Sequence, residues 1–400
     1  MVMVRETHVH GETLYVCEFC GLLYKEKYWA QRCEAYCKEH NACSLDIMQH
    51  AVHIKAGDKK PPKALALFSG GLDSMLAIKV VMDQGVEVEA VHFMNPFSAH
   101  NENLVKEFCE EVGIKLHQVA LGQELLDIVV KPKHGYGSQL NPCIDCRILT
   151  LRKAKDLAEK IGADFLVTGE VLDERPFSQR RETMLLIEKE AGLEGKILRP
   201  LSAKLLPETT AEKQNLIDRK KLLAIRGRRR LPQLRLAEKL RIKRYLNPSG
   251  GCLLTDPRFA ERLKEHLAHE EKLTMTDVAL LRLGRHFRIK NVKVIVGRNK
   301  EENEKILSIS GQNGNFVQME VTDYMGPVTL LLGKPDFETV QKAAAITVRY
   351  SDAPSGIPVR VRYATAKGER VIKVQAASDD ELRQFSIQKS AASKRTIGHR

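Results

Sequence analysis

The sequence has no long apolar segment and few cysteines. No stretch approaches the ~18 consecutive apolar residues that cross a bilayer, and the first ten residues lack the apolar stretch of a signal peptide. We therefore predict a cytoplasmic protein with no membrane partner. Nine cysteines in 400 residues are too sparse for a disulfide scaffold. An odd number in a reducing compartment indicates metal or sulfur chemistry instead. No pattern indicates an oligomeric state.

Charge is abundant and unevenly distributed. With 43% hydrophobic and 29% charged residues, the composition is that of a folded globular protein. The net charge of +13 favours a polyanionic partner. Thirteen basic residues against two acidic ones lie between Lys213 and Arg244, so most of the excess charge belongs to one segment.

Changes in composition divide the chain into five predicted parts. Residues 1–56 hold five cysteines and form a small module. Short apolar runs and amphipathic stretches alternate over residues 63–210, which predicts an α/β doubly wound parallel sheet. A basic helical segment (211–273), an α+β domain (274–385) and a mobile tail (386–400) follow. Strands of the α+β domain are predicted at 292–296, 316–321, 328–332, 346–350, 359–363 and 371–374.

A glycine-rich loop joins the first predicted strand of the α/β region to the next helix. Two glycines permit a tight turn, and the helix N-terminus adds partial positive charge, so the loop suits a pyrophosphate group. Serine hydroxyls can donate to phosphate oxygens, and the aspartate can hold Mg²⁺ that bridges them. The alternative is an incidental glycine turn. The loop consists of Ser69, Gly70, Gly71, Leu72, Asp73 and Ser74.

This loop resembles the SGGxDS loop of the PP-loop ATP pyrophosphatases, which cleave ATP between its α and β phosphates and adenylate a carbonyl oxygen. The resemblance implies an adenine nucleotide alpha hydrolase-like fold that binds ATP. It also implies that Phe93 and Met94, at the end of the second strand, line the adenine pocket; core packing is an equal alternative for both. Gly169, in Thr168-Gly169-Glu170 at the end of a later strand, resembles an element near the nucleotide.

Three further cysteines fall outside the amino-terminal module and the apolar helices. Cys143 and Cys146 open a predicted helix at CxxC spacing, and Cys252 lies in a distant turn. Three chemistries suit them: a dithiol redox pair, a persulfide relay through Cys143 and Cys252, or a 4Fe-4S cluster with one iron left open. Zinc with a fourth ligand is another alternative. We favour the cluster, because thiolate is the soft ligand that iron-sulfur clusters require.

The order SGGxDS, CxxC and a lone distant cysteine resembles the iron-sulfur-dependent tRNA thiouridine synthetases of the PP-loop superfamily. The NPCxxC element and the basic segment also resemble the tRNA 2-thiouridylases. The resemblance implies a tRNA-uridine 2- or 4-sulfurtransferase that uses ATP, Mg²⁺ and sulfide or a persulfide carrier. Asp73, Cys143 and Cys252 would be its catalytic residues. The alternatives are an amide-forming PP-loop ligase and a non-catalytic RNA-binding or quality-control protein.

Two regions are predicted to contact tRNA. In the basic segment, a helix with one apolar side and one arginine-rich side would neutralise several phosphates; a solvated charge run is the alternative. In the last domain, the stretch from Val296 to Asn303 resembles the VGRNxxxN element of the NFACT RNA-binding domain, which implies RNA contact by Arg298. The candidates in the basic segment are Arg226, Arg228, Arg229, Arg230, Arg241, Lys243 and Arg244.

The amino-terminal cysteines have zinc-module spacing. A CxxC pair is followed by two cysteines one helical turn apart, which predicts a tetrahedral Zn²⁺ site; His40 or Cys43 is an alternative to one of the last two. Such a module can contact RNA, or it can simply need a metal because its core is small. The predicted ligands are Cys17, Cys20, Cys33 and Cys37.

Overall fold

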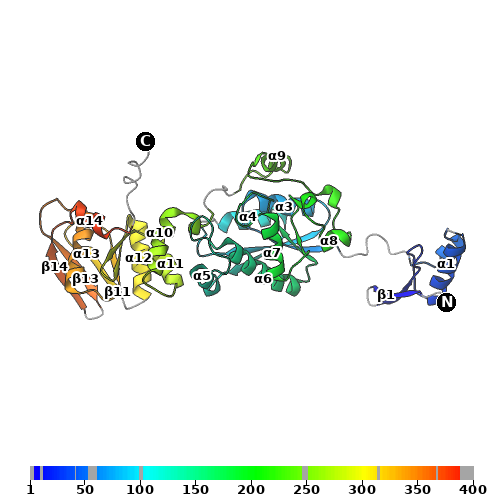
Figure 1. Ribbon diagram of the computed structural model, residues 1–400, viewed down its shortest axis with the longest axis horizontal. Helices are drawn as coiled ribbons and strands as arrows, with labels where there is room; N and C mark the ends of the chain where they lie inside the picture. Colours follow the sequence, from blue (N-terminus) through cyan, green and yellow to red (C-terminus); the bar gives the residue numbers. More distant parts are fainter. Residues whose placement is uncertain are drawn as a thin grey trace. The chain divides into compact units, whose positions relative to one another are not determined.

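The computed structural model describes residues 4–9, 12–40, 42–52, 61–98, 102–245, 251–312, 316–365 and 368–387 (Figure 1). Contacts divide the chain into two units, Met1–Pro61 and Pro62–Arg400. Residues 388–400 of the predicted tail (386–400) and residues 57–60 of the predicted linker lie outside the described residues. The first two tail residues are described, and the Ile387 amide donates to His286 O at 3.1 Å. No described helix is long and apolar enough to cross a membrane.

The first unit is a small antiparallel sheet with two helices. The strands β1 (Arg5–Val9), β2 (Glu12–Val16) and β3 (Leu23–Tyr24) pair in that order. The helices are α1 (Lys27–His40) and α2 (Leu45–Met48). Among the described residues of this unit, three cysteines belong to the buried apolar core, together with only four other residues. A core of this size is marginal, so sulfur ligation of a metal would add needed stability.

The second unit begins with a five-stranded parallel sheet. Its strands are β4 (Lys63–Leu67), β5 (Glu87–Met94), β6 (Leu116–Ala120), β7 (Phe165–Thr168) and β8 (Ile197–Leu198). The spatial order is β6-β5-β4-β7-β8, so the chain reverses its direction of travel across the sheet at β4. The predicted doubly wound α/β fold is confirmed. Ligands of such sheets bind at the carboxyl ends of the strands, at the point of reversal.

Helices cover both faces of this sheet because its strands are apolar on both faces. One buried core contains residues of α3 (Leu72–Met82) and α4 (Glu102–Val112). The other contains residues of α6 (Cys143–Ile161) and α7 (Arg181–Ala191), which lie on the opposite side of the sheet in Figure 1. A further helix, α5 (Gln123–Val130), follows β6.

The arginine-rich part of the basic segment, residues 213–244, is mostly irregular, and the prediction of one helix through it is wrong. Its α-helices are α8 (Thr210–Lys213) and α9 (Leu231–Lys239), and a further helix of the predicted segment begins only at Pro257. Between them, residues 222–229 have no helical backbone. The reason is tertiary: amides of this stretch donate to carbonyl oxygens of neighbouring segments instead of to their own turn, as at Ile225, whose amide bonds Leu201 O at 2.8 Å.

The chain ends in an antiparallel sheet with helices. After α10 (Pro257–Leu267) and α11 (Met275–Leu281), six strands pair in the order β14-β13-β11-β12-β10-β9. The strand predicted at 346–350 is wrong, because these residues end or follow α13: Ala343, Ala344 and Thr347 recur on its buried face at helical spacing. The elements are β9 (Arg285–Ile289), β10 (Val292–Val296), α12 (Lys300–Gln312), β11 (Phe316–Val321), β12 (Thr329–Leu332), α13 (Phe337–Arg349), β13 (Val359–Thr365), β14 (Gly368–Val374) and α14 (Asp379–Phe385).

Candidate nucleotide and thiol site

The glycine-rich loop turns sharply between β4 and α3. Gly70 has φ 78°, a left-handed conformation that favours glycine. The Ser74 hydroxyl donates to the Gly71 carbonyl oxygen at 2.7 Å, and the Gly71 amide donates to Ser69 Oγ at 3.3 Å. Gly169, after β7, lies so close that a Cβ there would stand 2.5 Å from the Ser74 amide nitrogen. The loop and the end of β7 therefore meet at the reversal point of the sheet.

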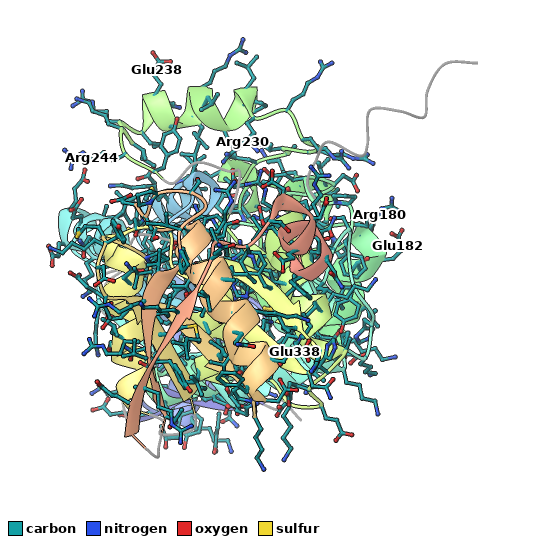
Figure 2. All side chains as sticks on the ribbon, turned by 90° about the vertical axis from the view of Figure 1, so that its left-hand side faces the viewer. Arg180, Glu182, Arg230, Glu238, Arg244 and Glu338 are labelled. Atoms are coloured by element: carbon teal, nitrogen blue, oxygen red, sulfur yellow. The ribbon has the colours of Figure 1, made fainter. Side chains whose placement is uncertain are left out.

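Asp73 is held by an arginine from the basic segment. Arg230 Nη2 donates to Asp73 Oδ2 at 3.0 Å, across 157 residues of sequence. Burial raises the pKa of Asp73, and the charges of Arg230 and Arg175 oppose that rise. Arg230 lies on the side of α9 that faces the rest of the unit, whereas Glu238 points away from it (Figure 2). The sequence predicts that Arg230 points outward and contacts RNA. In the structure, Arg230 lies at the nucleotide loop instead.

The two residues proposed for the adenine pocket end β5. Phe93 and Met94 are both half-buried at the carboxyl edge of the sheet. Phe93 packs against apolar residues of two separate cores. The structure therefore gives Phe93 a packing role and leaves Met94 at the edge where ligands bind.

Glu170, directly after Gly169, is the centre of a buried ion-pair network. Its carboxylate accepts from Arg147 Nε at 2.8 Å and Arg199 Nε at 2.9 Å. Burial alone would raise its pKa, yet the two guanidinium groups hold the pKa at about 2. Because Arg147 directly follows Cys146, the network ties the start of α6 to the end of β7.

Cys143 is positioned by the loop before α6. Asn141, which is buried, donates from Nδ2 to Cys143 Sγ at 3.1 Å. The same loop is anchored by His134, whose amide and Nδ1 each lie 3.0 Å from carboxylate oxygens of Asp145. Asp145 lies between the two cysteines of the CxxC element. The element therefore fixes the preceding loop through Asp145, and that loop places Asn141 against Cys143 Sγ.

Cys252 is brought to the CxxC pair by backbone pairing. Ser98 and Cys252 form an isolated antiparallel bridge just beyond β5, and the Leu253 amide donates to Phe97 O at 2.8 Å. After burial, the largest influences that raise the pKa of Cys146, to about 12, are the nearby Cys252 and Cys143 thiols. Cys146 and Cys252 also pack against the same buried apolar core.

The charge of Arg175 influences both a thiol and the nucleotide loop. Burial raises the pKa of Cys252 to about 11, while the Leu254 amide and the charge of Arg175 oppose that rise. The same guanidinium also acts on Asp73. Sequence reasoning missed Arg175, Arg147, Arg199 and Asn141. Only Asn141 and Arg147 carried a signal, since they flank the CxxC element.

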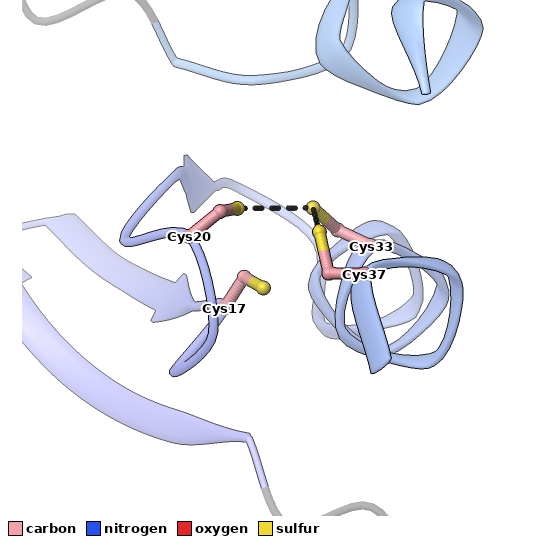
Figure 3. A group of neighbouring side chains, drawn as sticks. All are labelled: Cys17, Cys20, Cys33 and Cys37. Atoms are coloured by element: carbon pink, nitrogen blue, oxygen red, sulfur yellow. Dashed lines mark hydrogen bonds between the residues drawn. The ribbon is translucent and has the colours of Figure 1, made fainter. Parts of the chain in front are cut away.

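The amino-terminal thiols form a compact metal-binding group (Figure 3). Cys20 Sγ lies 3.4 Å from Cys33 Sγ, which lies 3.9 Å from Cys37 Sγ. Two ~2.3 Å bonds at the tetrahedral angle put the sulfurs of a zinc site about 3.8 Å apart. Among the described residues, Cys17, Cys20, Cys33 and Cys37 have ligand atoms that all lie within 4.8 Å of one another. Cys43 Sγ is 3.6 Å from Cys37 Sγ, next to this quartet.

The remaining predicted RNA ligands differ in their surroundings. Arg226 pairs with Asp173 at 2.6 Å, and Arg244 is 3.7 Å from Glu107. Arg298 forms an ion pair with Glu302 one helical turn later, at the start of α12. The four other candidates are exposed: Arg228, Arg229, Arg241 and Lys243.

Comparison with known proteins identifies relatives of two parts of the chain. Residues 60–206 match the family model "Thiamine biosynthesis protein (ThiI)", and residues 284–386 match "NFACT protein RNA binding domain". The tRNA-specific 2-thiouridylase MnmA of Pseudomonas fluorescens is 25% identical over 246 residues, 57% of this chain and 62% of that protein. A probable tRNA sulfurtransferase of Thermoanaerobacter is 34% identical over 146 residues, 35% of this chain and 36% of that protein.

Among solved structures, the U34-tRNA thiolase NcsA from Methanococcus maripaludis, with its [4Fe-4S] cluster, is 17% identical, with a TM-score of 0.32. The match covers 63% of this chain and 80% of that one. The chain spans less than two thirds of the length of the curated relatives described above. The resemblance to the PP-loop thiouridine synthetases, with an NFACT-type RNA-binding domain at the carboxyl end, is confirmed.

Proposed function

We propose that the protein is an ATP-dependent tRNA sulfurtransferase that replaces a uridine carbonyl oxygen with sulfur. The observation that carries the proposal is a chain of contacts from the thiols to the loop: Arg147, next to Cys146, bonds Glu170 at 2.8 Å. Gly169, next to Glu170, lies against the glycine-rich loop at Ser74. A nucleotide loop and a thiol group that lie near one another are what adenylation followed by sulfur insertion requires. An amide-forming ligase has no need of the thiols.

The glycine-rich loop would carry out the first half of the reaction. Ser69 and Ser74 would hold phosphate oxygens, and Asp73 would hold Mg²⁺ against them. The uridine oxygen attacks the α-phosphorus of ATP. The bond from the α-phosphorus to the oxygen that bridges it to the β-phosphate breaks, and pyrophosphate leaves. The adenylated oxygen then departs as part of AMP when sulfide adds to the same carbon.

The three thiols would supply the sulfur side of the site. An all-thiolate donor set fits a cluster of several metal atoms. Cys143, Cys146 and Cys252 would hold a 4Fe-4S cluster, which would supply an open iron for sulfide. Asn141 would stabilise the Cys143 thiolate through its hydrogen bond to sulfur.

The exposed arginines and the carboxy-terminal domain would hold the tRNA. Phosphate contacts position a nucleic acid without reading its sequence, which suits side chains such as Arg228 and Arg229. Binding through them weakens steeply with salt. The carboxy-terminal match to an RNA-binding domain supports the same partner.

Mass spectrometry of tRNA nucleosides tests the proposal. Cells that lack the gene should lose one thiouridine, and its mass fragments distinguish the 2- from the 4-position. Complementation with Cys252→Ser should fail, whereas Cys109→Ser, which alters a cysteine of the apolar core between α4 and the sheet, should restore the nucleoside. An unchanged nucleoside profile in the deletion strain refutes the proposal and favours a ligase or a non-catalytic RNA-binding protein.

A further inference from the structure

The stretch before α9 is fastened to the α/β domain at several points. We call residues 222–230 the strap. The amides of Leu223, Ile225 and Gly227 donate, at 2.9, 2.8 and 2.7 Å, to carbonyl oxygens of the segments that follow β8 and β7. These bonds fix the position of Arg230, the last residue of the strap, at the loop between β4 and α3.

At that place, Arg230 reaches into the nucleotide loop. Arg230 Nη2 contacts Asp73 Oδ2 at 3.0 Å, and its Nε lies 3.8 Å from a carboxylate oxygen of Glu174. The exposed fractions of the Arg230, Asp73 and Glu174 side chains are only 18%, 18% and 16%. Two carboxylates thus share one guanidinium in a half-buried site.

This ion-pair site has unfilled hydrogen-bonding capacity. Among the described residues, Asp73 Oδ1 and Arg230 Nε are buried without a hydrogen-bond partner. Gln233, in the first turn of α9, is fully buried, and neither its Oε1 nor its Nε2 has a partner. A purely structural ion pair in a folded protein satisfies such atoms. Asp73 Oδ1 and Arg230 Nε lie at the phosphate-binding loop, which indicates a site that a polar ligand completes.

The residues immediately before Arg230 have the opposite exposure. Arg228 and Arg229 are exposed, and no ion pair is formed by either within the described chain. One continuous backbone therefore carries two cations suited to RNA phosphates and, at the next position, a cation in the nucleotide site. A ligand that orders the first two also restricts the third.

We propose that Arg230 couples tRNA binding on the strap to nucleotide binding in the loop. The inference rests on the function proposed above. Without nucleotide, Arg230 neutralises Asp73. With Mg²⁺ and ATP bound, the Asp73 carboxylate would hold the metal, and the Arg230 guanidinium would bond phosphate oxygens, for which its planar set of donors is suited. Bound tRNA holds Arg228 and Arg229 and so lowers the entropy cost of ordering Arg230 on the phosphates. Each ligand then tightens the binding of the other by the same factor.

Calorimetric titration of the full chain with Mg²⁺ and α,β-methylene-ATP, an analogue that cannot be cleaved to AMP, measures this factor. The dissociation constant is determined with and without saturating tRNA. For the unaltered protein, we expect tRNA to tighten nucleotide binding by roughly 5- to 150-fold. In Arg230→Gln the factor should fall to about one, with unchanged tRNA affinity in the absence of nucleotide. Arg230→Lys, which keeps the charge, should retain an intermediate coupling factor. Such a factor shows that a folded variant at this position still responds to tRNA.

Arg235→Gln is the matched control, because Arg235 is an exposed arginine of α9 that makes no ion pair within the described chain. Its coupling factor should equal that of the unaltered protein. A full factor in Arg230→Gln, or a factor of one in the unaltered protein, overturns the inference even if cells still make the thiouridine. Absence of any nucleotide binding by the unaltered protein overturns both the inference and the proposed function.

Discussion

Glu170→Gln is the substitution whose effect on stability follows most directly from the structure. The substitution removes a carboxylate that is 4% exposed and leaves Arg199, also 4% exposed, with only Glu188 as a charged partner. Arg147 loses its partner as well. Breaking a buried ion pair by removing one member costs about 3–5 kcal/mol, because the remaining charge is buried without compensation.

The pKa of Glu170 leads to a similar figure. Its folded value of about 2 lies below the ordinary 4.5, which corresponds to about 3 kcal/mol at ~1.4 kcal/mol per pH unit. Since the folded pKa is lowered, this stabilisation is fully present above pH 4.5 and is lost as the pH falls towards 2. At a thermal shift of roughly 2–4 °C per kcal/mol, a loss of about 3–5 kcal/mol should lower the melting temperature of Glu170→Gln by about 6–20 °C at neutral pH.

Differential scanning calorimetry at pH 7 and at acidic pH tests both statements. The difference between Glu170→Gln and the unaltered protein should shrink as the pH falls below 4.5. Glu182→Gln is the control, because Glu182 is an exposed carboxylate on α7 (Figure 2). A loss at pH 7 no larger than that of the control refutes the assignment of Glu170 as a stabilising centre.

Three other predictions concern the remaining sites. Cys33→Ser should release the amino-terminal metal, measured by elemental mass spectrometry. Cys43→Ser should retain the metal, because the other four thiols form the compact quartet. Equal metal loss in both variants would contradict the four-ligand site. Gly169→Ala should weaken ATP binding at least tenfold in a filter or calorimetric assay, since its Cβ would stand 2.5 Å from the Ser74 nitrogen, and normal binding would show that the loop can shift freely. Gln233→Leu should raise the melting temperature, because an unpaired buried amide costs ~1–3 kcal/mol; a lower melting temperature would show that the amide is satisfied in solution.

Local features of this protein could be predicted from the sequence because each depends on a few consecutive residues. The turn at Gly70 needs glycine, and the parallel sheet follows from alternating strands and helices. The four amino-terminal thiols meet because a CxxC turn and two cysteines one helical turn apart each present their sulfurs on one side. In these cases, residues that are close in the sequence are also close in space.

Contacts across long stretches of chain were decided only by the tertiary structure. Arg230 reads as one more basic residue in a charged run, yet it lies at Asp73, 157 residues away. Residues 346–350 are β-branched and apolar enough to suit a strand, but packing against the antiparallel sheet places them at the end of α13. Cys252 reaches the CxxC pair because its neighbour bonds Phe97. The free energy that holds such residues in place comes from burial and from pairing with distant segments. A local sequence pattern therefore cannot predict their positions.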